Sequence, residues 1–274
     1  MPRREESAAN KARCWLCDLP VAPADIERQL QRLLALRAAE VVSSKPRKSI
    51  GPAISRLGAR LAPFPLSEYR SDPVLAMAVH RILLERGIDH ASLAALVAAY
   101  AKVLADDNHA PRPELALVVY LVRSCGFEIT EPLSFRNGSL SAAAELVITD
   151  RKQILEICRL VATITACGIR PIGLGELRLL LPSLCVSYAM DWDIEAVNTL
   201  LRTCAYVGAG KESACQWALD WLLDQQQSDG RFGLLAPEER KMGCETADWR
   251  LYFYPTVGTL WSLAEIHQPG FLVL

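Results

Sequence analysis

Three acidic residues lie close together in the segment Asp191-Trp192-Asp193-Ile194-Glu195. Two neighbouring carboxyl groups titrate as a pair, and burial beside a like charge raises the pKa of one of them. A carboxyl group kept protonated in a dry cavity can act as a general acid, strong enough in this setting to protonate an alkene. The spacing therefore predicts an acid–base pair in which Asp193 is the proton donor and Asp191 is its partner.

The same acids have a structural explanation, because a helix is expected to begin here. An aspartate at a helix N-terminus caps free backbone N–H groups, and acids in the first turn complement the helix dipole by about 0.3–1 kcal/mol each. Asp191 would then be the N-cap, with Asp193 and Glu195 in the first turn. The sequence leaves the catalytic and the structural explanation open.

Aromatic and further acidic residues complete a candidate substrate site. Aromatic faces stabilise a nearby cation by about 0.5–2 kcal/mol each. An aromatic-rich stretch, expected to be a loop before the last helix, would bring several such faces to one rim. We therefore expect the substrate to contact Tyr188, Trp192, Glu195, Glu245, Asp248, Tyr252 and Tyr254.

Composition and charge exclude several classes of partner. The chain has 274 residues, of which 51% are hydrophobic and 22% charged, so it can bury a sizeable core. A formal net charge of −1 offers no basic surface for nucleic acid or anionic lipid. No apolar run could span a membrane, and the first residues do not form a secretory signal. We expect a cytoplasmic protein without an integral membrane segment; its oligomeric state stays open.

Cysteine usage indicates a reduced protein without a metal site. There are nine cysteines, an odd number, and most lie in apolar periodic segments, where free thiols pack as small hydrophobes. Cys14 and Cys17 form a lone CxxC motif, whereas a zinc site usually needs a second cysteine or histidine pair. We expect no metal ligands, and the residues present require no organic cofactor.

Hydrophobic periodicity predicts an all-α chain, since strand-like alternation is almost absent. Residues 1–20 are polar and are expected to be a disordered tail, and residues 21–70 an N-terminal helix and linker. Residues 71–274 are expected to form one barrel-like helical domain. Its predicted helices span residues 73–86, 90–105, 113–125, 140–148, 151–167, 174–189, 192–206, 211–226 and 256–267, with Trp217, Trp221 and Trp261 in the core.

A weak internal repeat supports a barrel of helical pairs. Cys125, Cys167 and Cys204 each end a predicted helix in similar surroundings, at spacings of 42 and 37 residues. One helix–turn–helix unit has about this length, and such units stack into solenoids or close into toroids.

Residues 217–233 resemble the QW motif of squalene-hopene-type cyclases, Gln-x-x-Asp-Gly-x-Trp. Gln226, Asp229 and Gly230 match the motif, and Phe232 takes the place of the tryptophan. Gly230 can adopt a positive φ after the helix. Gln226 can bond free backbone groups at the helix end, while the aromatic ring is expected to pack across to the next repeat.

Two further segments carry related resemblances. Residues 191–196 are similar to the Asp-x-Asp-Asp-Thr-Ala motif of class II terpene cyclases, with Asp193 at the proton donor's place and Ile194 and Glu195 as departures. Residues 248–256 resemble a Tyr-His-Thr stretch of protein prenyltransferases. Pro255 replaces the zinc-binding histidine of that stretch, which disfavours zinc-dependent prenyl transfer.

Together these resemblances cover residues 190–267 and imply an α/α-toroid, a barrel of helical hairpins, in an incomplete or degenerate form. They imply a cyclase-like enzyme of specialised metabolism that performs acid-initiated cyclisation or rearrangement of an apolar, isoprenoid-like small molecule. The alternative is a non-catalytic α/α-barrel protein that binds a lipid, peptide or protein partner. A third interpretation, a peptide-modifying accessory protein, would use the N-terminal tail.

Overall fold

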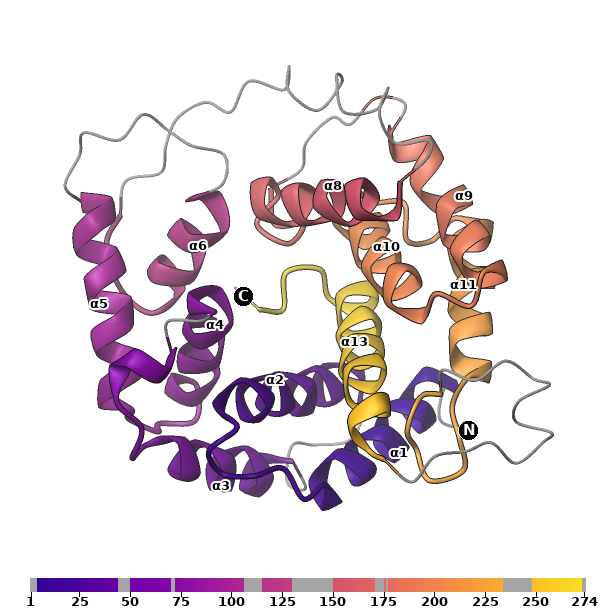
Figure 1. The fold of residues 1–274 in the computed structure, drawn as a ribbon. Helices are drawn as coiled ribbons and strands as arrows, with labels where there is room; N and C mark the ends of the chain where they lie inside the picture. Colours follow the sequence, from indigo (N-terminus) through magenta and orange to yellow (C-terminus); the bar gives the residue numbers. More distant parts are fainter. Residues whose placement is uncertain are drawn as a thin grey trace.

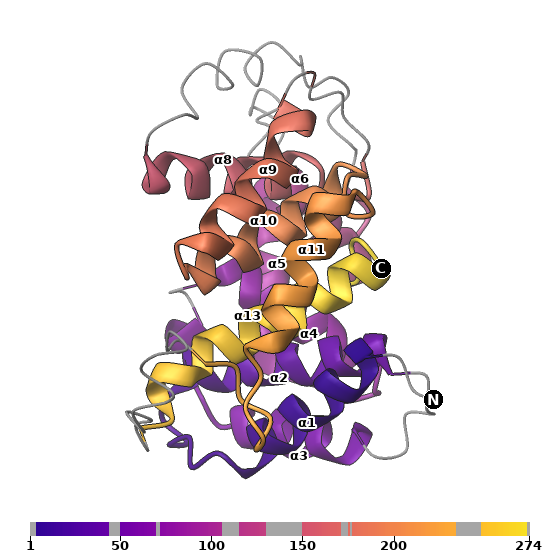
Figure 2. The same ribbon diagram turned by 90° about the vertical axis from the view of Figure 1, so that its right-hand side faces the viewer.

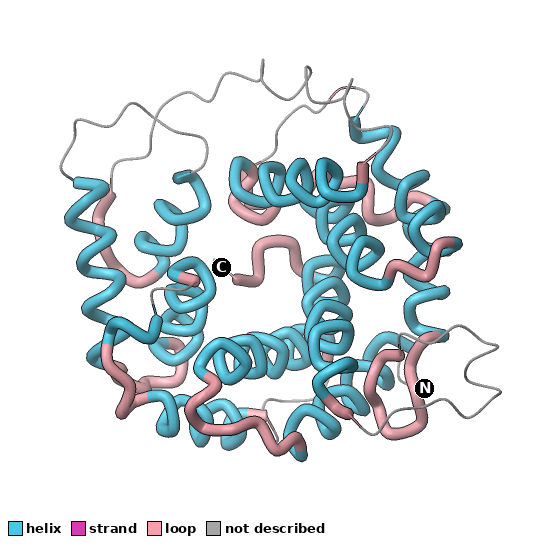
Figure 3. The backbone as a smooth tube through the Cα atoms, viewed as in Figure 1, coloured by secondary structure: helices cyan, strands magenta, loops and turns pink. Residues whose placement is uncertain are grey.

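The computed structural model describes residues 4–43, 50–69, 72–105, 115–129, 150–170, 175, 177–233 and 248–272. This part of the chain is all-α, as predicted, and contains 11 α-helices, one 3-10 helix and no strand (Figures 1, 2 and 3). The helix predicted at 140–148 lies outside the described residues. The helices are α1 (Arg4–Asp18), α2 (Ile26–Val42), α3 (Gly51–Leu61), η2 (Leu66–Tyr69), α4 (Pro73–Leu84), α5 (Ala91–Ala105), α6 (Ala116–Ser124), α8 (Arg151–Ile164), α9 (Leu177–Met190), α10 (Ile194–Tyr206), α11 (Ser213–Asp224) and α13 (Arg250–His267).

Six helices make a continuous series of contacts. Helix α2 contacts α4, which contacts α6; α6 contacts α8, α8 contacts α10, α10 contacts α13, and α13 returns to α2. In Figure 1 these six inner helices surround the centre of the molecule, while α1, α3, α5, α9 and α11 lie further out. Figure 2 shows α8–α10 at one end and α1–α3 at the other, with α13 between them. Buried apolar side chains from these layers form one continuous core.

Aspartate side chains start four of the six inner helices. A carboxylate before a helix satisfies backbone N–H groups that have no partner within the helix. The distances from carboxylate oxygen to backbone nitrogen are 2.9–3.2 Å. The same kind of cap therefore recurs along the series of inner helices. The four caps are Asp25 for α2, Asp72 for α4, Asp150 for α8 and Asp193 for α10.

The prediction of a disordered tail over residues 1–20 is wrong for Arg4–Asp18, which form helix α1. The buried face of α1 consists largely of alanines, including Ala9 and Ala12, with Leu16 at its end. Alanine adds little to a hydrophobic pattern but favours a helix and permits close packing. The average polarity of the segment therefore concealed a helix with one buried face.

Two other boundaries differ from the predictions. Residues 51–61, expected within a linker, form the amphipathic helix α3. Helix α13 begins at Arg250 rather than at residue 256, so Tyr252 and Tyr254 lie on a helix and not on a loop. Pro255 is the sixth residue of α13, so the helix continues through a proline that cannot donate a backbone hydrogen bond to the preceding turn. None of the described helices combines the length and apolarity that crossing a membrane requires.

Candidate functional site

A cavity of about 760 Å³ lies among four of the inner helices. Apolar side chains make up most of its wall, and polar groups are concentrated on α10 and near the starts of the helices. Leu272, after α13, also reaches it, in keeping with the position of the C-terminal segment in Figure 1. The lining residues are Gln31, Leu34, Asp72, Val74, Leu75, Ala78, Trp192, Asp193, Ile194, Glu195, Asn198, Thr199, Arg202, Arg250, Leu251, Tyr254, Pro255, Val257, Gly258, Trp261 and Leu272.

The cavity brings together part of the predicted site. Trp192, Asp193, Glu195 and Tyr254 line it. Four other predicted site residues do not appear in its wall, and Glu245 lies outside the described residues. Of those four, Asp191 and Asp248 are exposed, Tyr188 is half-buried and Tyr252 is buried beneath the guanidinium of Arg231.

Asp193 is held by two groups that favour its charged form. Its Oδ1 accepts the Ala196 N–H at 3.0 Å, and both carboxylate oxygens accept hydrogen bonds from Arg151 on α8. Partial burial raises the pKa of Asp193, but the hydrogen bonds from Arg151 and Ala196 outweigh burial and leave this pKa below its usual value. A proton donor needs the opposite shift, so this arrangement suits a carboxylate that accepts hydrogen bonds.

Asp191 and Trp192 end helix α9 in a Schellman turn. The Asp193 N–H bonds to Tyr188 O at 3.0 Å and the Trp192 N–H to Ala189 O at 3.2 Å. Trp192 takes a φ of +59°, where glycine is usual and a tryptophan costs about 1–2 kcal/mol. Its ring packs edge-on against Trp221, with centroids 5.6 Å apart, and also contacts the cavity. The turn directs Trp192 inward and leaves Asp191 in solvent.

A close polar seam joins α10 and α13 within the cavity wall. Gly258 of α13 faces Asn198 of α10, and a Cβ at Gly258 would lie 3.2 Å from Asn198 Nδ2. Asn198 donates to Thr259 Oγ1 at 3.3 Å, and the Ser262 hydroxyl lies 2.9 Å from the Asn198 carbonyl oxygen. Because the seam satisfies these buried polar groups, it fixes how α10 presents its next turn, including Arg202, to the cavity.

Trp261, predicted to be a core residue, forms part of the cavity wall between two charged side chains. The Arg202 guanidinium lies 4.4 Å from the Trp261 ring centroid, and Trp261 Nε1 donates to Glu265 at 3.1 Å. Glu265 is fully buried and also accepts the Gly270 N–H at 2.7 Å. Burial raises the pKa of Glu265 to about 7, although these hydrogen bonds oppose the shift. Glu265 thus connects the wall to the turn that carries Leu272.

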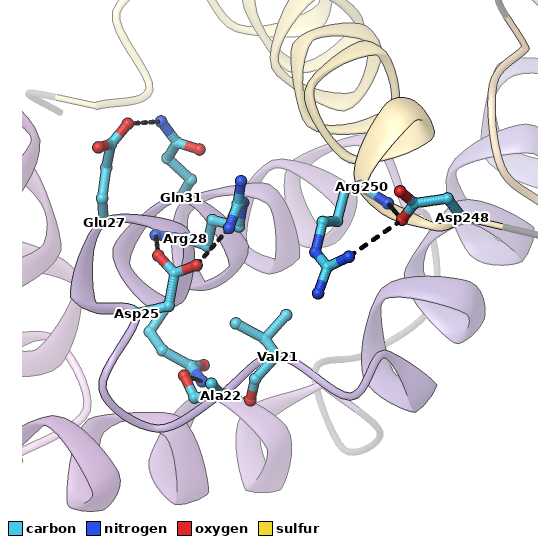
Figure 4. Close-up of polar contacts among 9 residues, drawn as sticks. Val21, Ala22, Asp25, Glu27, Arg28, Gln31, Asp248 and Arg250 are labelled. Carbon is cyan, nitrogen blue, oxygen red and sulfur yellow. Dashed lines mark hydrogen bonds and ion pairs between the residues drawn. The ribbon is translucent and has the colours of Figure 1, made fainter.

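Charged groups of both signs lie beside the cavity, where α2 approaches the start of α13. Figure 4 shows Arg28 of α2 across from Arg250, with Asp248 paired to Arg250 on its far side. Arg28 is paired with Asp25, and its guanidinium carbon lies 5.9 Å from the Tyr254 ring centroid. Each of these two arginines therefore has an acidic partner.

Several cavity residues were absent from the sequence-based prediction, Asn198, Arg202 and Ala78 among them. Ile194, Asn198 and Arg202 are four residues apart on a predicted helix, so their common face was visible in the sequence. Asp72 could also have been found, because it precedes a helix as Asp193 does. What the sequence did not provide was the pairing of α10 with α13 and of α2 with α4.

Comparison of the chain with protein-family models, curated proteins and solved structures finds no match. The likeness to cyclases and prenyltransferases therefore rests on the motifs of residues 190–267.

Proposed function

We propose that this chain is an α/α-toroid that binds an apolar small molecule of isoprenoid-like character in its central cavity. The main observation in support of this proposal is the cavity of about 760 Å³. Its volume falls within the range of small-molecule sites, about 300–1,000 Å³. The continuous contacts of the six inner helices, with further helices outside them, support the toroid. This proposal develops the non-catalytic alternative from the sequence.

The lining favours an apolar ligand with a small polar group. Leu34, Leu75 and Val257 offer aliphatic surface, and Trp261 offers an aromatic face. Burying apolar ligand surface contributes roughly 25 cal/mol per Å². The polar side chains of Asn198 and Arg202 lie on one side of the cavity, on α10, where a hydroxyl or carbonyl group of the ligand would find partners.

Acid-initiated cyclisation is the second candidate, favoured by the position of Asp193 in the cavity wall. It requires Asp193 to become protonated, which Arg151 opposes in the arrangement described. A substrate that displaced Arg151 into solvent would remove that obstacle. Cyclisation therefore requires a protonated Asp193, whereas binding alone does not.

Binding can be tested by titrating the protein with 1-aminoanthracene, a neutral apolar fluorophore, and then with polyprenyl alcohols and diphosphates as competitors. Trp261→Ala should weaken probe binding at least fivefold, because it removes a face of the cavity wall. Trp217→Ala is the matched control. The prediction that Trp217 lies in the core is wrong, because this residue is 45% exposed, and it does not line the cavity. Equal affinities for the two variants would refute binding in this cavity.

Catalysis is tested separately by product analysis with polyprenyl diphosphates and epoxides. The binding proposal expects no cyclised product from the wild type. If the wild type formed cyclised product and Asp193→Asn formed none while still binding the probe, the cyclase would replace the binding protein as the proposed function. Product that persists in Asp193→Asn would show catalysis by other groups.

A further inference from the structure

Three buried thiols from three different helices meet at one point outside the cavity wall. Cys185 lies on α9, Cys204 on α10 and Cys215 on α11, and their sulfur atoms all lie within 4.8 Å of one another. The Sγ atoms of Cys185 and Cys204 are 3.8 Å apart. All three residues are at most 1% exposed.

The spacing of these sulfurs fits a shared metal ion. A zinc–sulfur bond is about 2.3 Å, so sulfurs that share such an ion lie roughly 3.8–4.0 Å apart. The Cys185–Cys204 separation has this value, and the third sulfur needs only a small movement. A disulfide would instead require about 2.05 Å between two sulfurs and would leave the third unused.

Core packing alone does not account for the arrangement. Cys158 and Cys167 are buried to the same degree, yet neither belongs to the group of three. Burial of cysteine as a small hydrophobe therefore does not by itself bring sulfurs together in this chain. Three helices have to place one thiol each at the same depth to produce the cluster.

The kind of ligand atom in the cluster indicates which metal ion would bind. Within the described part of the chain the cluster contains sulfur alone, with no imidazole or carboxylate beside it. Structural zinc sites almost always have four ligands, whereas thiolates also favour Cu(I). Cu(I) accepts three sulfurs without a fourth ligand, and each of the three helices buries a leucine one turn from its cysteine: Leu181, Leu200 and Leu219.

We propose that Cys185, Cys204 and Cys215 form a three-sulfur binding site for Cu(I). Each sulfur that binds as thiolate gives its proton to solvent and forms a Cu–S bond. Copper remains Cu(I), so no electron transfer is needed. The ion links α9 and α11 to the inner helix α10 and so stabilises the folded chain. The site is separate from the cavity, because none of its three cysteines lines that wall.

The test uses full-length reduced protein under anaerobic conditions, in a Cys14→Ser/Cys17→Ser background that removes the CxxC motif on α1. Cu(I) is supplied from a colorimetric competing chelator, both to folded protein and during refolding. We expect one tightly bound Cu(I) per chain and a rise in Tm. In Cys204→Ala and Cys215→Ala the affinity should fall at least tenfold, and the rise in Tm should disappear.

Cys158→Ala is the matched control, since it removes a buried thiol outside the cluster. It should keep both the affinity and the rise in Tm. Unchanged Cu(I) affinity in Cys204→Ala and Cys215→Ala, or no bound Cu(I) in the background protein, would overturn the proposal.

X-ray absorption of the loaded background protein provides a readout that does not depend on how the variants fold. Three sulfurs at one bond length are expected around copper. Two-sulfur coordination would overturn the three-cysteine site. A four-coordinate Zn(II) complex that displaces Cu(I) at equal concentration would overturn the choice of metal.

Discussion

Arg151, the first residue of α8, binds the carboxylate of Asp193, the residue that caps α10. Its Nη2 lies 3.2 Å from Asp193 Oδ1 and its Nε reaches Oδ2. The same guanidinium donates to Glu195 at 2.7 Å. One cation thus joins the starts of two consecutive inner helices and pairs with two acids of the 191–195 segment that line the cavity.

Breaking this ion pair should have a small, measurable effect on stability. Arg151 is 45% exposed at its side chain, so Arg151→Gln should lower the free energy of unfolding by only about 0.2–1 kcal/mol. Asp193→Asn should cost a similar amount, because asparagine still caps the helix. Urea denaturation of both single variants and of the double variant gives the coupling energy. A coupling of zero would show that the pair contributes nothing to the stability of the fold.

The pH dependence of the pair follows from the lowered pKa of Asp193. A carboxyl group whose folded-state pKa is lowered stabilises the protein above its unfolded-state pKa of about 3.9. That contribution disappears as the pH falls through the folded-state value. The stability difference between wild type and Arg151→Gln should therefore be constant near neutral pH and shrink in acid.

The turn after α11 should depend on glycine for two separate reasons. Gly230 has a φ of +103°, and a Cβ there would collide with the carbonyl of Lys11 on α1. Gly230→Ala should therefore destabilise the protein by about 2–4 kcal/mol and loosen α1. Gly87→Ala is the matched control, because Gly87 also has a positive φ, +67°, but no neighbour within 4 Å of its added Cβ. It should cost only about 1–2 kcal/mol.

Chemical denaturation and limited proteolysis of the Arg4–Asp18 segment would measure both effects. If the two variants lost the same stability and α1 stayed protected, the contact between this turn and α1 would be refuted. The same turn contacts two helices. Gln226 donates to Ala8 O on α1 at 2.8 Å, and the Phe232 N–H donates to Thr256 Oγ1 on α13 at 3.0 Å.

Most helix positions could be predicted from the sequence, because a helix that packs on one face repeats its apolar residues every 3.6 positions. Helices α4, α5, α9, α10 and α11 all lie within or close to their predicted ranges. Helix α1 escaped prediction since its buried face is made mostly of alanines. The start of α13 escaped prediction since this helix runs through Pro255, and proline is unfavourable inside a helix.

Only part of the candidate site could be predicted from the sequence, for a different reason. Trp192, Asp193, Glu195 and Tyr254 could be selected by residue type near helix starts. Arg151 could not, because it is 42 positions from Asp193 and its effect depends on how α8 packs on α10. The sequence predicted four of the side chains in the cavity wall, whereas the ionisation of Asp193 depends on a tertiary neighbour.

Filling the cavity should separate binding from stability. Ala78 of α4 is 1% exposed and contributes to the wall, so Ala78→Leu places an isobutyl group in the cavity. We expect 1-aminoanthracene to bind at least tenfold more weakly, with stability unchanged or raised by up to about 1 kcal/mol. Ala95→Leu on the exposed face of α5 is the control and should leave probe affinity unchanged. Unaltered binding in Ala78→Leu would place the probe elsewhere.

Glu265 should give the protein a distinctive loss of stability as the pH rises. Its pKa is raised by burial from 4.5 to about 7, so between these values the folded chain holds a proton that the unfolded chain has lost. Stability is then greatest below pH 4.5 as far as this group is concerned. It falls by up to about 1.4 kcal/mol per pH unit until the pH passes 7.

The histidines His80 and His90 act in the opposite direction, because burial lowers their pKa values and their contribution is lost as the pH falls below 6.5. The difference between wild type and Glu265→Gln isolates the glutamate, since the histidines are common to both. Urea denaturation from pH 4.5 to 8 should show this difference changing steadily up to pH 7 and levelling above it. Glu156→Gln, at an exposed position on α8, is the control and should show no such trend. A difference independent of pH would mean that Glu265 is ionised throughout, and the link from Trp261 to the Gly270 turn would then rest on a buried carboxylate.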